Sequence, residues 1–216
     1  MNVFVRLLVL ISFFYTGKAI AQPRDAILLT NAAKTEVEKK IMEASRNITS
    51  LQCKFTEEKS SVLLTHKSVS KGILLYKTPS SLRWEYTHPA VLTLILHQDK
   101  VSIRNGKGES LGSGKMFKQL AYFIISTVNG NGLRDNKDFT VDYYRIQQDK
   151  SVLWVKLTPV SKQLKAVYAS IEIKISTKDY LATEIILNEL SGDKTDILLS
   201  DKTLNGAIAS SQFSTD

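Results

Sequence analysis

Cysteine, histidine and proline are scarce in this chain of 216 residues, which contains one cysteine, three histidines and four prolines. The single Cys53 cannot form a disulfide within the chain, and three histidines with one cysteine argue against a Cys/His zinc site. Ten glycines and the few prolines leave no proline-rich linker or Ser/Gly stalk. The hydrophobic fraction of 43% and charged fraction of 23% are typical of a globular protein. We expect one compact domain without a metal site or a cofactor.

Signatures of catalysis are also missing. The glycine-rich segment 105–115 suggests a phosphate-binding loop, but five residues separate Gly108 from Gly114 where that loop needs four. Met116 follows where the loop needs serine or threonine. The chain has no Gly-x-Ser-x-Gly elbow, and its scattered histidines indicate no catalytic triad. We therefore expect a protein that is not an enzyme.

The N-terminus has the features of a secretory signal peptide. A basic start containing Arg6 precedes the apolar run Leu7–Tyr15, and Ala19-Ile20-Ala21 supplies a small-residue cleavage site. The apolar run is shorter than the ~20 residues that span a bilayer. We expect removal of residues 1–21 and a mature domain of residues 22–216. Its first residue, Gln22, is not the cysteine that a bacterial lipid anchor requires, so we expect a soluble, unanchored protein.

Basic charge is modest and dispersed. Removal of Arg6 and Lys18 with the leader lowers the formal net charge from +8 to +6. Lysines and arginines stand singly between apolar residues, without a run or a basic helical stripe. This distribution argues against nucleic-acid binding. A solvated surface and a weak attraction to an anionic membrane or an acidic partner both remain open.

Hydrophobic periodicity predicts two helices among many strands. Thr35 and Glu38 suggest a capping box, with a helix continuing to about Asn47. A second helix is predicted over Lys115–Val128, because Phe117, Leu120, Ile124 and Val128 recur at helical spacing. Its apolar arc is wide, which suits a helix inserted into a larger structure. Alternation with period two predicts about ten strands: one from Leu51, then Val69–Lys77, Leu82–Thr87, Leu92–Gln98, Val101–Arg104, Phe139–Gln147, Val152–Leu157, Ala169–Ser176, Ala182–Leu190 and Thr195–Ser200.

Several predicted strands are apolar on both faces. The clearest runs are Ile73–Tyr76, Val91–Leu96, Val152–Val155 and Ile185–Leu187. Each face of such a strand must be covered, and two helices can hardly cover ten strands. The pattern is consistent with a residual apolar cavity and equally with an ordinary sandwich core.

One central motif resembles a known family. The string from Gly72 to Pro89, GILLYKTPSSLRWEYTHP, is similar to the LolA signature G-x-L-x-Y-x-x-P-x-x-(F/L)-R-W-x-Y-x-x-P. The LolA family comprises periplasmic lipoprotein carriers of Gram-negative bacteria. The resemblance covers about Val37 to Phe213. Weaker matches are Phe55, Leu157-Thr158-Pro159, Gly192-Asp193-Lys194-Thr195 and Asn205-Gly206 before Phe213.

The resemblance implies an incomplete antiparallel β-barrel of about ten to eleven strands, open on one side. An N-terminal helix and a central helix would cover its apolar concave face. It implies a periplasmic carrier that takes the acyl chains of lipoproteins from the inner to the outer membrane, with an inner-membrane ABC-type release complex and an outer-membrane acceptor as partners. We expect a monomer. The expected cavity residues are Leu74, Tyr76, Leu82, Trp84 and Tyr86, and the expected lid residues are Phe117, Leu120, Ile124 and Val128.

Two departures from the family pattern mark a divergent branch. Carriers of the family often have a basic residue directly before the first proline, which is thought to latch the lid, whereas this chain has Thr78 there and Lys77 one place earlier. Lys77 should point to the other face of its strand. The chain also ends soon after Phe213, where some carriers continue. A carrier of another amphiphile, such as a glycolipid or pigment lipid, and a half-barrel sensor or binding protein therefore remain alternatives.

Overall fold

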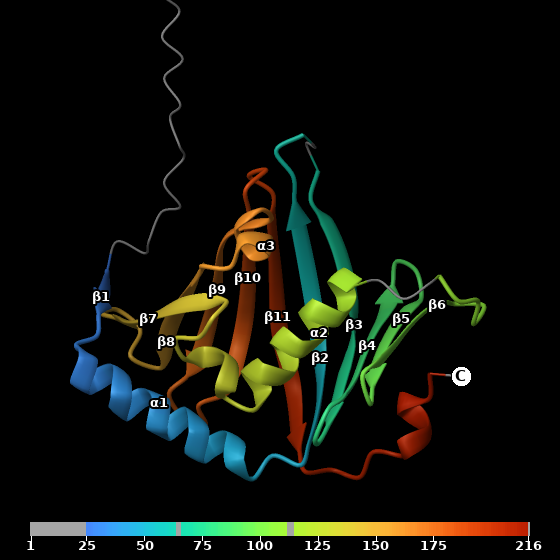
Figure 1. The fold of residues 1–216 in the computed structure, drawn as a ribbon, viewed down its shortest axis with the longest axis horizontal. Coiled ribbons are helices and arrows are strands. Elements are labelled where there is room, and N and C mark those ends of the chain that lie inside the picture. Colours follow the sequence, from blue (N-terminus) through green and yellow to red (C-terminus); the bar gives the residue numbers. More distant parts are fainter. Residues whose placement is uncertain (1–24, 64–65, 112–114, 216) are drawn as a thin grey trace, which may run out of the picture.

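The computed structural model describes residues 25–63, 66–111 and 115–215, which form a curved antiparallel sheet with helices on its concave side (Figure 1). The strands are β1 (Ala26–Leu28), β2 (Ser50–Ser60), β3 (Ser68–Lys77), β4 (Ser81–His88), β5 (Leu92–His97), β6 (Lys100–Asn105), β7 (Phe139–Ile146), β8 (Val152–Pro159), β9 (Tyr168–Ser176), β10 (Ala182–Glu189) and β11 (Lys194–Leu204). The helices are α1 (Asn31–Arg46), α2 (Lys115–Val128) and α3 (Lys162–Lys165), with 3-10 turns η1 (Asn131–Leu133) and η2 (Ser210–Phe213).

The sheet has 11 strands in the order β1-β7-β8-β9-β10-β11-β2-β3-β4-β5-β6, and neighbouring strands pair antiparallel throughout. Because β1 and β6 stand at the two ends of this order, the sheet does not close on itself. The predicted incomplete antiparallel barrel with covering helices is confirmed.

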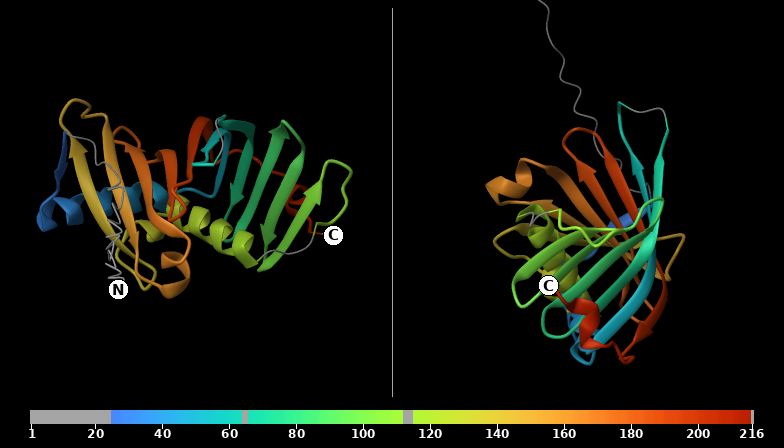
Figure 2. Two further views of the ribbon diagram at one scale, coloured as in Figure 1. Left: turned by 90° about the horizontal axis from the view of Figure 1, so that it is seen from above. Right: turned by 90° about the vertical axis from the view of Figure 1, so that its right-hand side faces the viewer.

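Helix α2 crosses the concave face of the sheet, while α1 runs along one end of it (Figure 2). Lys34 of α1 ties this end together: its Nζ lies 2.8 Å from a carboxylate oxygen of Asp135 and donates to Val141 O at 2.6 Å. Gly130 follows α2 with φ +76°, and a Cβ there would lie 3.3 Å from Ile41 Cγ2. The glycine thus ends α2, as Asn129-Gly130 predicted, and lets α1 approach closely.

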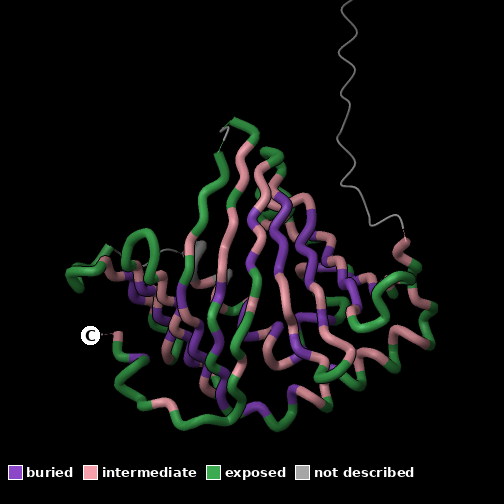
Figure 3. The backbone as a smooth tube through the Cα atoms, turned by 180° about the vertical axis from the view of Figure 1, so that it is seen from behind, coloured by how far each residue is buried: buried purple, intermediate pink, exposed green. Residues whose placement is uncertain are grey.

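Apolar side chains of alternate strand positions form the core on the concave face. On β2, β3 and β4 the buried residues gather in one half of each strand (Figure 3), around Cys53, Leu74 and Trp84, which lie side by side in the sheet. On β3, Gly72 makes room for the ring of Phe55 from β2. A Cβ at Gly72 would lie 2.6 Å from that ring and 1.9 Å from Glu85 O, so only glycine fits. Phe55 can therefore lie across β3 and contact the aromatic side chains of β4.

The convex face of β3 and β5 is covered by the C-terminal segment. Phe213 is 1% exposed and forms a small cluster with Leu75 and Ile95. Arg83 Nη1 donates to Gln212 O at 3.2 Å, and Lys77 Nζ donates to Ile208 O at 3.1 Å. This segment explains why the strands around the central motif are apolar on both faces.

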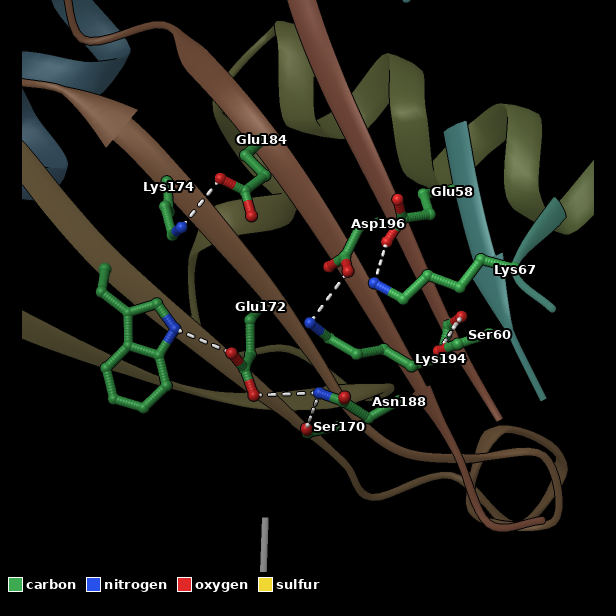
Figure 4. Close-up of polar contacts among 11 residues, drawn as sticks. Glu58, Ser60, Lys67, Ser170, Glu172, Lys174, Glu184, Asn188, Lys194 and Asp196 are labelled. Carbon is green, nitrogen blue, oxygen red and sulfur yellow. Dashed lines mark hydrogen bonds and ion pairs between the residues drawn. The ribbon is translucent and has the colours of Figure 1, made fainter. Parts of the chain in front are cut away.

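The convex face of β8–β11 is polar instead (Figure 4). The buried carboxylate of Glu172 accepts hydrogen bonds from Trp154 Nε1 at 3.1 Å and Asn188 Nδ2 at 2.9 Å. The pairs Lys174–Glu184 and Lys194–Asp196 join neighbouring positions at 2.8 and 2.9 Å. Because most of these polar groups pair with one another, this half of the convex face needs no covering layer, although Asp196 Oδ1 is buried without a partner among the described residues.

The structure corrects several sequence predictions. The first helix begins at Asn31, with Thr30 as its N-cap, so the capping box predicted at Thr35 and Glu38 is wrong. Thr35 lies inside the helix and donates its hydroxyl to Asn31 O. The second helix has the predicted bounds, and all ten predicted strands are present. The short elements β1, α3, η1 and η2 were not predicted. The predicted leader, residues 1–21, lies outside the described residues.

Candidate functional site

Three of the predicted cavity residues meet on one wall of the concave face. Leu82, Trp84 and Tyr86 alternate along β4 and line a cavity of about 70 Å³. Neighbouring strands and helix α2 supply the rest of the lining, namely Glu57, Leu94, Ile95, Leu96, Val101, Ala121, Ile124, Leu187 and Ile197. Ala121 and Ile124 belong to α2, so the helix forms the other wall. Ligand pockets usually measure about 300–1,000 Å³, so this cavity is too small for a lipid while α2 stays in place.

Aromatic packing fixes the shape of this wall. The ring centroids of Phe55 and Trp84 lie 4.5 Å apart, and those of Phe55 and Tyr86 lie 5.1 Å apart in an edge-to-face arrangement. Such contacts stabilise beyond the area they bury. The position of Phe55 depends on Gly72, so the first glycine of the central motif helps to place its later Trp84 and Tyr86.

The wall also carries polar groups. Glu57 follows Leu51, Cys53 and Phe55 as the next inward position of β2, and its carboxylate accepts a hydrogen bond from Tyr86 Oη at 2.8 Å. Burial raises the pKa of Tyr86, and the neighbouring Glu57 carboxylate raises it further, so the phenol stays protonated. Among the described residues, the buried indole N–H of Trp84 has no partner at normal hydrogen-bond geometry, although it lies near enough to the Tyr86 hydroxyl to oppose part of the rise in the pKa of that phenol.

Leu74 and Tyr76 lie apart from these three residues. Leu74 lines a second cavity of about 30 Å³ together with Cys53, Ile124 and Val128. Tyr76 is buried in the core and lines neither of these two cavities. The structure therefore divides the predicted set of five residues between two small cavities that border α2 and the core next to them.

Two titratable side chains that line the second cavity, Cys53 and Lys202, have shifted pKa values. Burial raises the pKa of the Cys53 thiol to about 11, which keeps it protonated at neutral pH. Burial lowers the pKa of Lys202, whose side chain lines the same cavity. Both shifts arise because this part of the concave face is poorly solvated.

Two of the four expected lid residues can be placed. Ile124 is buried between both cavities, and Val128 lines the smaller one. Phe117 and Leu120 belong to α2, but their side chains lie outside the described residues. Tyr122 donates its hydroxyl to the carboxylate of Asp99 in the β5–β6 turn. This bond ties the middle of α2 to the sheet.

The two residues at the expected latch position make other contacts. Thr78 donates its hydroxyl to Thr49 O at 3.2 Å. Lys77 donates to Ile208 O on the convex face, which confirms that it points away from the concave side. The side chains of Lys77 and Thr78 therefore do not contact α2 through these hydrogen bonds. The hydrogen bond between Tyr122 and Asp99 holds α2 to the sheet instead, and the sequence did not suggest it.

A larger cavity of about 560 Å³ lies on the other side of α2 and was not predicted. It has the volume of a ligand pocket. Its lining comes from α2, η1, the segment before β7, the region of α3, and β9: Tyr122, Phe123, Ser126, Asn131, Gly132, Asn136, Lys137, Asp138, Phe139, Ser161, Gln163, Leu164, Val167, Tyr168 and Ile171. Apolar side chains such as Phe123, Phe139 and Leu164 line it beside polar ones. Figure 2 shows α2 and α3 on the same side of the sheet.

Within the described ranges, no group of three or more His, Cys, Asp or Glu side chains could hold a metal ion. None of the described helices is long and apolar enough to cross a membrane. The geometry is that of a binding site, with an apolar groove, a helix lying in it and cavities along both sides of that helix.

Comparison with known proteins identifies the family. Residues 46–216 match the family described as outer membrane lipoprotein carrier protein LolA. The chain belongs to the LolA family. None of the curated proteins matches its sequence.

Several solved structures are similar to this chain at low sequence identity. MucB is 14% identical with a TM-score of 0.51, over 86% of this chain and 63% of MucB. A MucA/MucB complex of Pseudomonas aeruginosa is also similar. A LolA superfamily protein of Nitrosomonas europaea is 13% identical with a TM-score of 0.45, covering 84% of this chain and 97% of that protein. Lipoprotein LppX of Mycobacterium tuberculosis is 10% identical with a TM-score of 0.47, covering 83% and 99%.

Proposed function

We propose that this chain is a periplasmic carrier that holds the acyl chains of lipoproteins against its concave face and takes them from the inner to the outer membrane. In this proposal residues 1–21 are a signal peptide, and residues 22–216 form the lipid-carrier domain, which acts as a monomer without a cofactor or catalytic residues. An inner-membrane ABC-type complex would release the cargo to the protein, and an outer-membrane acceptor would receive it. Membership of the LolA family supports the carrier role.

The observation that carries the proposal is that a single helix, α2, occupies the apolar groove of an unclosed sheet. Burying an acyl chain is worth about 0.8 kcal/mol per methylene, so lipid chains do not cross water unaccompanied. A helix that already covers the groove hides the same apolar surface in the empty protein. Its displacement offsets part of the binding energy, which allows the cargo to be released.

The proposed roles of individual residues follow from this arrangement. Leu74, Tyr76, Leu82, Trp84 and Tyr86 would contact acyl chains, and Phe117, Leu120, Ile124 and Val128 would form the apolar side of the lid. The larger cavity beside α3 adds Phe123, Phe139 and Leu164 as further contacts. A chain bound there could extend into the groove as α2 moves.

One observation favours a second candidate, a carrier of another amphiphile such as a glycolipid or pigment lipid. Thr78 stands where carriers of the family often have a basic residue, and it bonds to Thr49 instead. The lid would then be held differently, which could suit a different cargo. Mass spectrometry of the ligand that co-purifies from the periplasm distinguishes the two: a lipid-modified peptide supports the first candidate, and a free lipid supports the second.

The carrier role predicts binding of an acyl-chain fluorescent reporter at about one per protein. Trp84→Asp should abolish this binding, because an unpaired charge in an apolar cavity costs several kcal/mol. Leu94→Asp is a second variant in case Trp84→Asp does not fold. Leu94 lines the same cavity but is only partly buried, and its replacement by aspartate should also abolish binding. Fluorescence titration measures affinity, and circular dichroism checks the fold.

Val69→Asp is the matched control, since Val69 is an exposed apolar residue of β3 outside the cavity lining. Its affinity for the reporter should equal that of the unmodified protein. Unchanged affinity in folded Trp84→Asp and Leu94→Asp proteins would show that this wall does not bind the ligand. Failure of the unmodified protein to bind any acyl reporter would refute the carrier proposal.

A further inference from the structure

Trp84 combines deep burial with an unused hydrogen-bond donor. Its side chain is 5% exposed, and within the described part of the chain its Nε1–H forms no hydrogen bond of normal geometry, although the Tyr86 hydroxyl lies near it. A buried polar group without a partner destabilises the folded protein, so native structures rarely contain one without a reason. Trp154, the other tryptophan, shows the usual solution, because its Nε1 donates to Glu172.

An acceptor for hydrogen bonds lies on the same cavity wall. Glu57 and Tyr86 line the cavity together with Trp84, and Tyr86 Oη donates to one carboxylate oxygen of Glu57. An ionised carboxylate has about four lone-pair sites, so it can accept further hydrogen bonds. A donor and an acceptor thus face one cavity whose other lining residues are all apolar.

We infer that Trp84, Tyr86 and Glu57 form a polar subsite that binds the amide group of an N-acylated amphiphile, an inference that rests on the proposed carrier function. The amide carbonyl accepts a hydrogen bond from Trp84 Nε1–H, and the amide N–H donates to the Glu57 carboxylate. Tyr86 keeps its bond to Glu57 and holds that carboxylate against the wall. The acyl chain then lies along the groove that α2 vacates.

Hydrogen-bond chemistry favours an amide over the commoner ester. An ester offers acceptors only, so it can bond to Trp84 but leaves Glu57 without a new donor. An amide satisfies both groups at once, and a hydrogen bond to a charged partner is stronger than one to a neutral partner.

The test compares two ligands that differ in one N–H. N-dodecanoylglycine methyl ester and O-dodecanoylglycolic acid methyl ester have the same chain length, and the amide N–H of the first is an ester oxygen in the second. Both displace the fluorescent acyl reporter from the full protein. We expect the amide to bind about tenfold more tightly than the ester, as a charge-assisted hydrogen bond provides.

Three variants test which side chains cause the difference in affinity between the amide and the ester. Glu57→Met removes the acceptor at similar side-chain size, and the amide-to-ester ratio should fall to about one. Trp84→Phe keeps the stacking on Phe55 but removes the donor, so both ligands should weaken several-fold while the ratio persists. Glu58→Met is the matched control. Glu58 lies on the convex face, paired with Lys67 (Figure 4), and its loss should leave both affinities unchanged.

The outcomes separate this inference from the proposed function. Equal affinity of the unmodified protein for amide and ester, or an unchanged ratio in folded Glu57→Met, would refute the subsite while reporter binding still supports a carrier. Absence of reporter binding to the unmodified protein would refute both. A ratio that disappears in Glu57→Met and persists in Glu58→Met supports the subsite.

Discussion

At the scale of single residues, Lys202 shows how burial on the concave face affects a charged side chain. Its side chain lines the same small cavity as Leu74 and Cys53, where burial lowers its pKa from the ordinary lysine value of 10.5. At neutral pH the lysine is charged in the folded and the unfolded protein, but only the folded protein bears the cost of partial desolvation. Lys202 therefore lowers stability at neutral pH.

Lys202→Met should raise the melting temperature at pH 7. The gain should be small, about 2 °C, because solvent still reaches part of the side chain. As pH rises through the lowered pKa, the folded protein loses the Lys202 proton before the unfolded protein does. Stability of the unmodified protein then increases with pH, and the advantage of Lys202→Met should shrink by about pH 10.5.

Differential scanning calorimetry between pH 7 and the alkaline range measures this difference. Lys54→Met is the control, because Lys54 is exposed and pairs with Asp201 on the surface. It should not raise the melting temperature. A Lys202→Met protein that is less stable at pH 7 would mean that the ammonium group makes a favourable contact that outweighs its desolvation.

The sequence predicted which residues share a face where the alternation of apolar and polar residues was regular. Leu82, Trp84 and Tyr86 occupy alternate positions of one strand, so their shared face follows from the period of two. Glu57 was missed because a charged residue normally marks the solvated end of a pattern. Counting inward positions from Leu51 through Phe55 points to it. The lining of the larger cavity comes largely from connecting segments, for which strand alternation gives no signal.

At the scale of elements, long periodic segments were predicted well and short ones were missed. Helix α2 and ten strands carry several apolar residues each at regular spacing. The first strand, β1, has three residues, and α3 has four, which is too few to establish a period. The start of α1 was misplaced because Thr35 with Glu38 satisfies the capping-box spacing, although Thr30 is the residue that caps.

The C-terminal segment with η2 should stabilise the sheet without contributing to binding. Phe213→Ala removes a ring that packs on Leu75 and Ile95 from the convex side. Truncation of a buried phenylalanine typically costs about 3–5 kcal/mol, so we expect a loss of about 3 kcal/mol in the free energy of unfolding. Urea denaturation measures this loss, and titration with the acyl reporter measures affinity, which should not change.

The neighbouring Ser211→Ala is a suitable control because Ser211 is exposed in the same turn. It should alter stability by less than about 0.5 kcal/mol. Loss of reporter binding in folded Phe213→Ala would contradict the separation of roles. It would mean that covering the convex face also sets the shape of the concave wall.

At the scale of the whole molecule, the mode of ligand binding depends on whether α2 moves away from the sheet. The helix borders two cavities too small for a lipid on one side and one of ligand size on the other. A ligand that uses Leu82, Trp84 and Tyr86 must displace α2. A ligand confined to the larger cavity can bind while α2 stays in place. The two modes bury different parts of the same apolar surface.

Cys53 is a built-in probe of that movement. Its thiol is 1% exposed and lines the cavity that Ile124 and Val128 of α2 close. Burial holds its pKa at about 11, so a thiol reagent at pH 8 should react very slowly with the folded protein. A saturating acyl ligand that displaces α2 should raise the labelling rate at least tenfold, because it exposes the thiol and lets its pKa return toward the ordinary value.

Tyr122→Phe provides the matched variant, since it removes the bond from α2 to Asp99 and leaves the aromatic ring. Labelling without ligand should become several-fold faster, because local opening of α2 then costs less free energy. The rate is measured by mass spectrometry of the labelled protein across ligand concentrations. A rate that stays constant while the ligand saturates would mean that α2 is fixed core, and binding would then be confined to the larger cavity beside α3.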